Sequence, residues 1–322
     1  MRAYFSCFSF LYKVVYNYTD GMQSKLAGGL YRMQWNKIGV IGAGTMGQGI
    51  SEMLAAQGIE VLLLERSTQK LDQAWEHIES SLDKQMEKWA ITASEKKLIL
   101  SRIHKATDMR LLTDCDMVIE SINEDLEQKK LLFQQLDALC PPPIILASNT
   151  STLSLTEIAA ATTHPERVIG MHYLYPVSRI HLVEIIRGLK TSEETFALTK
   201  QFVEHKIQKH GIQVYESPGF VTTRLICVLI NEAMHTLSEH VATAEDIDLA
   251  MRMGYDFHYG PLELADRFGL DSVLVAMERM FREFGDVKYR PSVLLKQMVR
   301  AGELGTKTGQ GFFRYDKDGD RL

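Results

Sequence analysis

Short apolar runs alternate with amphipathic stretches up to about residue 216. Apolar runs at residues 37–41 and 60–64 flank a helical pattern at residues 45–57, and a long amphipathic stretch begins at Thr68. The same alternation predicts further strands at residues 117–120, 144–148, 168–173, 182–186 and 212–215, and further helices at residues 126–139 and 192–209. Continuous apolar runs are typical of strands that are buried on both faces, so the pattern predicts an α/β domain with a mostly parallel sheet.

The pattern changes where Ser217-Pro218-Gly219 interrupts regular structure. Beyond it, helices are predicted at residues 220–239, 243–253, 261–268, 271–284 and 292–301. The mixed-charge segment at residues 84–97 is predicted as a solvated helix. We therefore expect an α/β domain at residues 33–216 and an all-α domain at residues 217–322, after an N-terminal extension of unknown role at residues 1–32.

Composition narrows the class of protein. The 322 residues agree with two domains, and a net charge of −5 without a long basic run argues against nucleic acid as a partner. The four cysteines form no CxxC pair, which favours a reducing, cytoplasmic location over a disulfide framework or a zinc ribbon. No apolar run reaches the ~18 residues of a membrane span. His235 and His240 are five residues apart and share no helix face, so no metal site is predicted.

A glycine-rich turn, GAGTMG at residues 42–47, lies between the first predicted strand and the first predicted helix. This context makes the G-x-G-x-x-G match a strong indication of a dinucleotide site in a Rossmann-type domain. Gly42 permits the tight turn, Gly44 lets the backbone approach a pyrophosphate, and Gly47 allows close helix packing. The predicted cofactor-binding residues of the turn are Gly42, Gly44, Thr45, Met46 and Gly47.

Glu65 ends the second predicted strand, where a carboxylate accepts hydrogen bonds from the adenosine ribose. A carboxylate there would repel the additional phosphate of NADP by ~1 kcal/mol or more at contact range. Arg66 beside it could face that phosphate, but an arginine just past a strand is more often solvated. NAD is therefore the predicted cofactor.

His172 is the strongest candidate among the ten histidines for the proton transfer that accompanies hydride transfer. It lies near the end of the strand at residues 168–173, which we expect to pair antiparallel with residues 182–186 at the sheet edge. With a turn centred near Ser178, His172 faces Glu184 across this pair. A carboxylate beside an imidazole fixes the tautomer and favours the protonated form, as a general base requires. A structural histidine beside a surface glutamate is the alternative interpretation.

From about residue 37 to residue 315 the chain resembles the short-chain L-3-hydroxyacyl-CoA dehydrogenases, in particular the 3-hydroxybutyryl-CoA dehydrogenase type. The resemblance is carried by six segments in order: IGVIGAGTMGQG at residues 38–49, ASNTSTL at 147–153, GMHYLYPV at 170–177, LVE at 182–184, SPGFVTTR at 217–224 and KTGQGF at 307–312. It implies NAD-dependent oxidation of a 3-hydroxyacyl-CoA in fatty acid metabolism, and a homodimer formed through the helical domain.

The resemblance also implies roles for individual residues. It makes His172 the catalytic base with Glu184 as its partner, and it places Ser151 at the substrate oxygen. Glu124, Lys129 and Lys307 would contribute to the cofactor site. Ser81 and Lys88 match positions that meet coenzyme A, and their spacing of seven residues puts them on one helix face.

The chain departs from the family at Tyr175 and Thr223, where family members usually carry asparagine in the segments HFFNP and PGFIVNR. The second asparagine ordinarily lies near the substrate carbonyl and the catalytic histidine, so Thr223 is a candidate substrate-binding residue. Losing a donor there could cost ~3 kcal/mol of transition-state stabilisation. We therefore expect dehydrogenase activity with an altered acyl preference. Two alternatives stay open: a dehydrogenase of a non-CoA hydroxy acid, like the gulonate enzyme related to lambda-crystallin, and an NAD-binding protein with little catalysis.

Overall fold

The computed structural model describes residues 35–317 and 319–322. The extension predicted at residues 1–32 lies outside the described residues. Among the helices that are described, none is both long enough and apolar enough to cross a bilayer.

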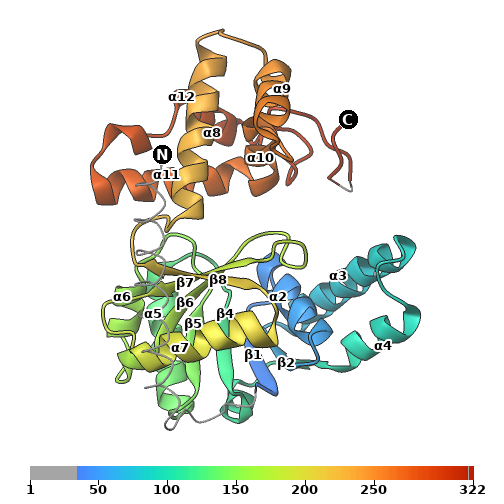
Figure 1. The fold of residues 1–322 in the computed structure, drawn as a ribbon, viewed down its shortest axis with the longest axis vertical. Coiled ribbons are helices and arrows are strands. Elements are labelled where there is room, and N and C mark those ends of the chain that lie inside the picture. Colours follow the sequence, from blue (N-terminus) through green and yellow to red (C-terminus); the bar gives the residue numbers. More distant parts are fainter. Residues whose placement is uncertain (1–34, 318) are drawn as a thin grey trace, which may run out of the picture. The chain divides into compact units, whose positions relative to one another are not determined.

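Eight strands of the described residues form one sheet in the order β3-β2-β1-β4-β5-β6-β7-β8 (Figure 1). Their bounds are β1 Lys37–Ile41, β2 Glu60–Leu64, β3 Ile103–Ala106, β4 Met117–Glu120, β5 Ile145–Ser148, β6 Val168–Tyr173, β7 Leu182–Arg187 and β8 His210–Tyr215. The pairs from β3 to β6 are parallel. Every residue of β4, β5 and β6 is buried, which explains why these strands read as continuous apolar runs. The predicted mostly parallel sheet is confirmed.

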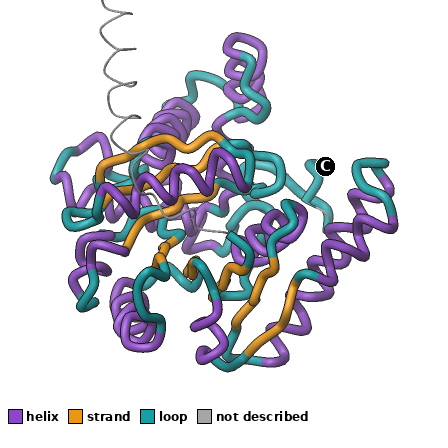
Figure 2. Tube along the Cα trace, turned by 60° about the horizontal axis from the view of Figure 1, so that its bottom comes forward, coloured by secondary structure: helices purple, strands orange, loops and turns teal. Residues whose placement is uncertain are grey.

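Helices lie on both sides of the strands (Figure 2). Their bounds are α2 Thr45–Ala56, α3 Thr68–Glu87, α4 Ala93–Ser101, α5 Leu126–Leu139, α6 Leu155–Ala160 and α7 Glu193–Gln201, with short turns η1 Met109–Asp114, η2 Pro165–Arg167 and η3 Phe202–Lys206. One apolar core includes Phe133 of α5, Ile158 of α6 and Leu146 of β5, all fully buried. Packing of this kind holds the ends of the parallel strands, near which Glu65, Glu124 and Ser151 lie, in fixed positions.

The antiparallel pair β6 and β7 has the predicted register, with His172 opposite Glu184. Its predicted place at the sheet edge is wrong, because β8 pairs in parallel with β7 and forms that edge. A parallel neighbour needs a crossover connection, and the helical segment α7 with η3 supplies it. Glu184 therefore lies on an interior strand, which explains why its side chain is fully buried.

The segment at residues 84–97 is two helices, not the single helix that its mixed charges predict. The helix α3 ends at Glu87, and α4 begins after Thr92. The Thr92 hydroxyl accepts from the N–H of Glu95 at 3.2 Å, while the Glu95 carboxylate accepts from the N–H of Thr92 at 2.7 Å. This capping box starts a new helix. Its Thr-x-x-Glu spacing is present in the sequence, but the prediction considered only the mixed charges of the segment. The edge strand β3 also escaped prediction, because its two central residues are polar and exposed.

The residues that follow the break at residues 217–219 are helical, as predicted. The helices are α8 Thr222–Ser238, α9 Ala244–Tyr255, α10 Pro261–Phe268, α11 Leu270–Phe284 and α12 Val293–Ala301, with a short turn η4 Val287–Tyr289. Their own apolar core contains Ile230, Met234, Leu262, Met277 and Leu295, all fully buried. The methionines of this core, such as Met234 and Met277, fill space between the helices.

The carboxylate of Asp266 anchors the C-terminal segment to α10. It is fully buried and accepts hydrogen bonds from the N–H groups of Phe312 and Phe313, at 3.0 and 2.9 Å, and from the Tyr315 hydroxyl at 3.0 Å. Burial raises the pKa of Asp266 to about 6, although these three donors oppose the rise. The neighbouring Asp248 carboxylate adds to it.

We expect Asp266 to make the folded state more stable as the pH falls. Because its folded-state pKa of about 6 exceeds the unfolded value of 3.8, the folded protein binds this proton more tightly. The contribution is complete below the unfolded pKa and is lost as the pH rises through 6; by linkage it is on the order of 3 kcal/mol. Urea unfolding of the wild type and Asp266→Asn should therefore show the wild type losing stability relative to the variant as the pH rises across this window. A free-energy difference between them that is independent of pH would contradict the prediction.

Candidate active site

The turn that joins β1 to α2 contains three motif glycines, Gly42, Gly44 and Gly47. Of these three, only Gly44 borders open space. A Cβ on Gly42 would lie 2.5 Å from the Ser121 carbonyl oxygen, and a Cβ on Gly47 would lie 1.8 Å from the Gly42 carbonyl oxygen. A Cβ on Gly44 would meet nothing within 4 Å. Gly42 and Gly47 are therefore required by the packing of the chain itself, whereas the missing side chain at Gly44 leaves room for a ligand.

A cavity of about 450 Å³ begins at this turn and is lined by Gly42, Gly44 and Glu65 among others. The first turn of α2, where Thr45 is exposed and Met46 half-buried, carries no acidic residue, so its free N–H groups favour an anion. Glu65 accepts from the N–H of Ala43 at 3.4 Å and from that of Arg66 at 2.9 Å. Arg66 is exposed and also lines the cavity. An open turn, a free helix start and a carboxylate at the end of β2 together fit the dinucleotide predicted from the sequence.

Two alanine substitutions separate the two functions of these glycines. Gly44 has a φ of −75°, which alanine adopts without strain, so we expect Gly44→Ala to keep the wild-type stability within about 1 kcal/mol while NAD binds at least roughly tenfold more weakly. We expect Gly47→Ala to lose several kcal/mol of stability, because its Cβ would overlap a backbone carbonyl. Thermal unfolding and titration with NAD measure both effects. Equal losses of stability in the two variants would refute this division.

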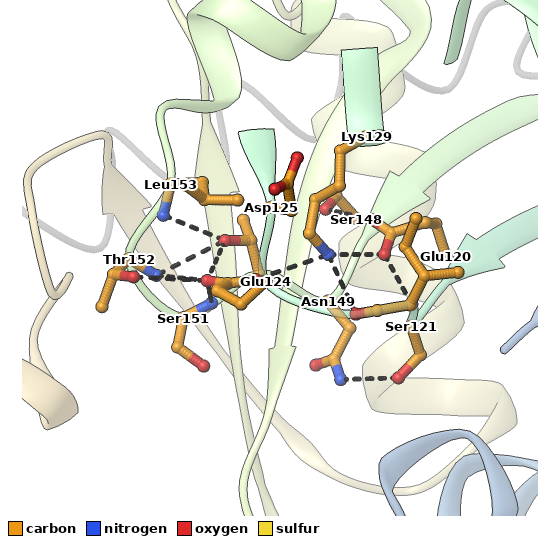
Figure 3. Close-up of polar contacts among 12 residues, drawn as sticks. Glu120, Ser121, Glu124, Asp125, Lys129, Ser148, Asn149, Ser151, Thr152 and Leu153 are labelled. Atoms are coloured by element: carbon orange, nitrogen blue, oxygen red, sulfur yellow. Dashed lines mark hydrogen bonds and ion pairs between the residues drawn. The ribbon is translucent and has the colours of Figure 1, made fainter. Parts of the chain in front are cut away.

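A buried lysine, Lys129, lies between the carboxylates of Glu120 and Glu124 (Figure 3). Lys129 of α5 is 1% exposed, and its Nζ is 2.5 Å from Oε1 of Glu120, which ends β4 and is fully buried. The other oxygen of Glu120 accepts from the Ser148 hydroxyl at 2.6 Å. The Lys129 ammonium also lies 3.4 Å from a carboxylate oxygen of Glu124. The ends of β4, β5 and α5 are thus joined by one ionic network.

Glu124 fixes the turn that carries Ser151. Its Oε1 accepts from the Thr150 hydroxyl at 2.6 Å and from the N–H groups of Ser151 and Thr152 at 2.9 and 3.0 Å (Figure 3). Burial alone would raise the pKa of Glu124, but the charge of Lys129 and these hydrogen bonds outweigh it, so the pKa lies below its usual value. The carboxylate is therefore ionised at neutral pH and can only accept, which holds the turn in place.

Arg279 of α11 reaches the same turn from the helical part of the chain. Its guanidinium donates to the Thr152 hydroxyl at 2.7 Å and to the backbone carbonyl of Glu124 at 2.6 Å. A second cavity, about 880 Å³, lies on this side and is lined by Arg279, Thr152 and Pro218 among others. Arg279 thus ties the helical residues to the turn that holds Ser151.

His172 and Glu184 form a buried pair. The distance from His172 Nδ1 to Glu184 Oε2 is 2.6 Å, and the side chains are 6% and 0% exposed. Burial would raise the pKa of Glu184, but the hydrogen bond and charge of His172, together with donors from Thr222, place it below the usual value. An ionised carboxylate only accepts, so when the imidazole is neutral Nδ1 carries the hydrogen and Nε2 keeps its lone pair. This is the tautomer that a general base needs.

The remaining predicted site residues lie outside the turns and the histidine pair described above. The Ser81 hydroxyl bonds to the buried Glu52 of α2, and Lys88 is exposed at the C-terminal cap of α3. Thr223 is half-buried in the first turn of α8 and Tyr175 is 56% exposed. Lys307 is not brought to the glycine turn: its ammonium pairs with Asp271 at 2.7 Å, and it lines neither cavity.

Three residues of the site were missed from the sequence: Glu120, Thr222 and Arg279. Glu120 ends an otherwise apolar strand, and a lone charge in that position was a usable signal. Thr222 and Arg279 act through contacts with residues 38 and 155 positions away, which no local pattern encodes.

Comparison with known proteins matches most of the described residues to the two domains of one family. The family model for the NAD binding domain of 3-hydroxyacyl-CoA dehydrogenase matches residues 37–217, and the model for its C-terminal domain matches residues 219–315. The 3-hydroxybutyryl-CoA dehydrogenase of Clostridioides difficile is 43% identical over 281 residues, 87% of this chain and 100% of that protein.

Two solved structures of similar proteins have the same fold as this chain. The crystal structure of Mycobacterium tuberculosis FadB2 has a TM-score of 0.86 at 36% identity, and covers 88% of this chain and 100% of its own. That of (S)-3-hydroxybutyryl-CoA dehydrogenase PaaH1 from Ralstonia eutropha has a TM-score of 0.82 at 41% identity, with the same coverage.

Proposed function

The chain belongs to the 3-hydroxyacyl-CoA dehydrogenase family, a family of NAD-dependent oxidoreductases, and from this premise we propose that it oxidises a short-chain 3-hydroxyacyl-CoA reversibly to the 3-ketoacyl-CoA. His172 is the general base in this proposal and Glu184 is its partner. The observation that carries it is the buried hydrogen bond of 2.6 Å between the two side chains.

NAD supplies the hydride acceptor when it is bound. The residues proposed to hold it are the turn at residues 42–47, Glu65 at the end of β2, and Glu124. The open space at Gly44 and the free start of α2 support this placement. Lys129 contributes through its ion pairs with Glu120 and Glu124, which keep the neighbouring loops in place. Lys307 has no comparable support, because its ammonium is paired with Asp271.

The proton of the substrate hydroxyl passes to Nε2 of His172. The imidazole then becomes a cation, and the fully buried Glu184 carboxylate stabilises that cation at hydrogen-bond distance. In the reverse direction the imidazolium returns the proton to the oxygen. Ser151, on the turn fixed by Glu124, is proposed to donate to the substrate oxygen, because Thr150 to Thr152 are held by three hydrogen bonds to one carboxylate.

A short acyl chain on coenzyme A is proposed from the relatives named 3-hydroxybutyryl-CoA dehydrogenase. Lys88 supports a coenzyme A site, since it is an exposed cation at the end of α3, one position beyond the last helical residue. Thr223, in the first turn of α8, is proposed to contact the acyl group. A homodimer is proposed on the strength of exposed apolar side chains on the helical part, such as Leu225 at 68% and Met253 at 79% exposure.

A steady-state assay tests the proposal. NADH formation is measured with 3-hydroxyacyl-CoA esters from C4 to C10 and with free 3-hydroxybutyrate, using NAD and NADP, for the wild type and Thr223→Asn. We expect turnover of the CoA esters with NAD, and a change of chain-length preference in the variant. Turnover of the free acid alone would favour a dehydrogenase of a non-CoA hydroxy acid. NAD binding without turnover of any substrate by either protein would refute the proposed activity.

A further inference from the structure

The hydroxyl of Thr222 shares one carboxylate oxygen with His172. Thr222 Oγ1 donates to Oε2 of Glu184 at 2.7 Å, and His172 Nδ1 lies 2.6 Å from the same oxygen. The other oxygen, Oε1, accepts from the N–H groups of Val221 and Thr222 at 3.0 and 2.9 Å. Four donors therefore occupy a carboxylate that has about four acceptor positions.

The hydroxyl of Thr222 and the carboxylate of Glu184 come from different elements of the fold. Thr222 begins α8, while Glu184 lies in the middle of β7, so the hydroxyl approaches the carboxylate from outside the sheet. Glu184 is fully buried and the His172 side chain is 6% exposed, so water does not screen the contact as it would at the surface.

We propose that Thr222 sets the basicity of the His172 imidazole by withdrawing charge from the Glu184 oxygen that binds it. A carboxylate oxygen with a second donor accepts less strongly from Nδ1–H, so it stabilises the imidazolium less. Thr222 is thus a positioning residue that acts through Glu184, and the inference rests on the proposed role of His172. Without this hydroxyl, His172 would hold its proton more tightly and would be a base over a narrower range of pH.

Apart from Glu184, the described groups that contact His172 carry no charge. From β7 the facing charged group is Glu184. The segment before α8 contributes the ring of Phe220, whose centre is 5.7 Å from that of the imidazole. After β5, the uncharged Asn149 accepts from the N–H of Tyr173, beside His172. The charges of Glu124 and Arg279 are engaged with the turn at residues 150–152.

The test compares Thr222→Val, which removes the hydroxyl but keeps the shape and the backbone N–H, with Thr222→Ser, which keeps a hydroxyl. Thr236→Val is the matched control, because Thr236 is also on α8, its hydroxyl bonds to the Glu232 carbonyl, and it lies about 21 Å further along the helix. The titration midpoint of His172 is measured in the substrate-free protein by NMR of labelled histidine, with the signal assigned from the spectrum of His172→Gln. The pH profile of kcat/KM for 3-hydroxybutyryl-CoA oxidation is measured in parallel.

We expect Thr222→Val to raise the titration midpoint and the midpoint of the acidic limb of the kcat/KM profile by about half a unit to one unit. Thr222→Ser and Thr236→Val should match the wild type. An unchanged or lowered midpoint in Thr222→Val overturns the inference, as does a rise of equal size in Thr236→Val. If Thr222→Val does not fold, Thr222→Ala replaces it, with the same expectations.

The two measurements separate this inference from the proposed function. A raised NMR midpoint in a protein that turns over no substrate supports the effect of Thr222 and refutes the dehydrogenase activity. Turnover with an unchanged midpoint supports the activity and overturns the effect of Thr222.

Discussion

Replacing His172 with glutamine is expected to lower kcat for 3-hydroxyacyl-CoA oxidation by roughly a hundred- to ten-thousand-fold, which is the usual contribution of a general base. Glutamine is similar in size and can donate to Glu184, so the buried carboxylate keeps a partner. NAD binding should be unchanged, because the dinucleotide turn and Glu65 follow β1 and β2, whereas His172 lies on β6. Rapid-mixing and steady-state measurements of NADH formation, together with an NAD titration, test the prediction.

Glu184→Gln is the companion variant. Its side chain has a similar size but no charge, so the imidazolium loses its stabilisation. The amide NH2 also replaces one acceptor oxygen, so two of the four donors to Glu184 lose their acceptor. We expect a smaller loss of kcat than in His172→Gln, with the acidic limb of the pH profile shifted to lower pH. Full activity in His172→Gln would exclude this imidazole as the base.

Replacing Lys129 with methionine is expected to destabilise the folded protein by about 3–5 kcal/mol, because it leaves Glu120 as a buried charge without its cationic partner. Lys129 is 1% exposed and Glu120 is fully buried, so neither group can turn to water without moving the backbone. Urea unfolding monitored by circular dichroism gives the free energy of unfolding, provided that the transition is two-state.

The double variant Lys129→Met with Glu120→Gln is the control. It removes both charges, and the amide can accept from the N–H of Ile122 while its NH2 donates to the Ser148 hydroxyl, so we expect it to recover much of the lost stability. A double variant as unstable as Lys129→Met alone would mean that packing, and not the uncompensated charge, causes the loss.

Much of the α/β part could be predicted from the sequence because its information is local. The strand, glycine turn and helix at residues 37–57 carry periodicity and turn chemistry in consecutive residues. The pairing of His172 with Glu184 could also be predicted, since a short antiparallel connection fixes which residues face each other. The place of this pair in the sheet could not, because it depends on where the chain returns after α7.

The site was predicted less completely than the fold. The sequence singled out Glu124 and Lys129 through a resemblance, but their shared partner Glu120 is identified only by the distances in the folded chain. Arg279 is 155 residues from the backbone carbonyl of Glu124 that it binds. The cofactor contact that the resemblance implies for Lys307 stays a prediction, and the structure shows its ammonium paired with Asp271.

The hydrogen bonds from Val221 and Thr222 to Glu184 have a consequence for protein engineering. The carboxylate that orients the imidazole is completed by residues that follow the break at Ser217-Pro218-Gly219. A chimera that joined this nucleotide-binding half to a foreign helical half at that break would exchange the donors of Glu184 along with the new helices. Residues 217–224 should therefore stay with the nucleotide-binding half, and the two halves should be joined further along α8.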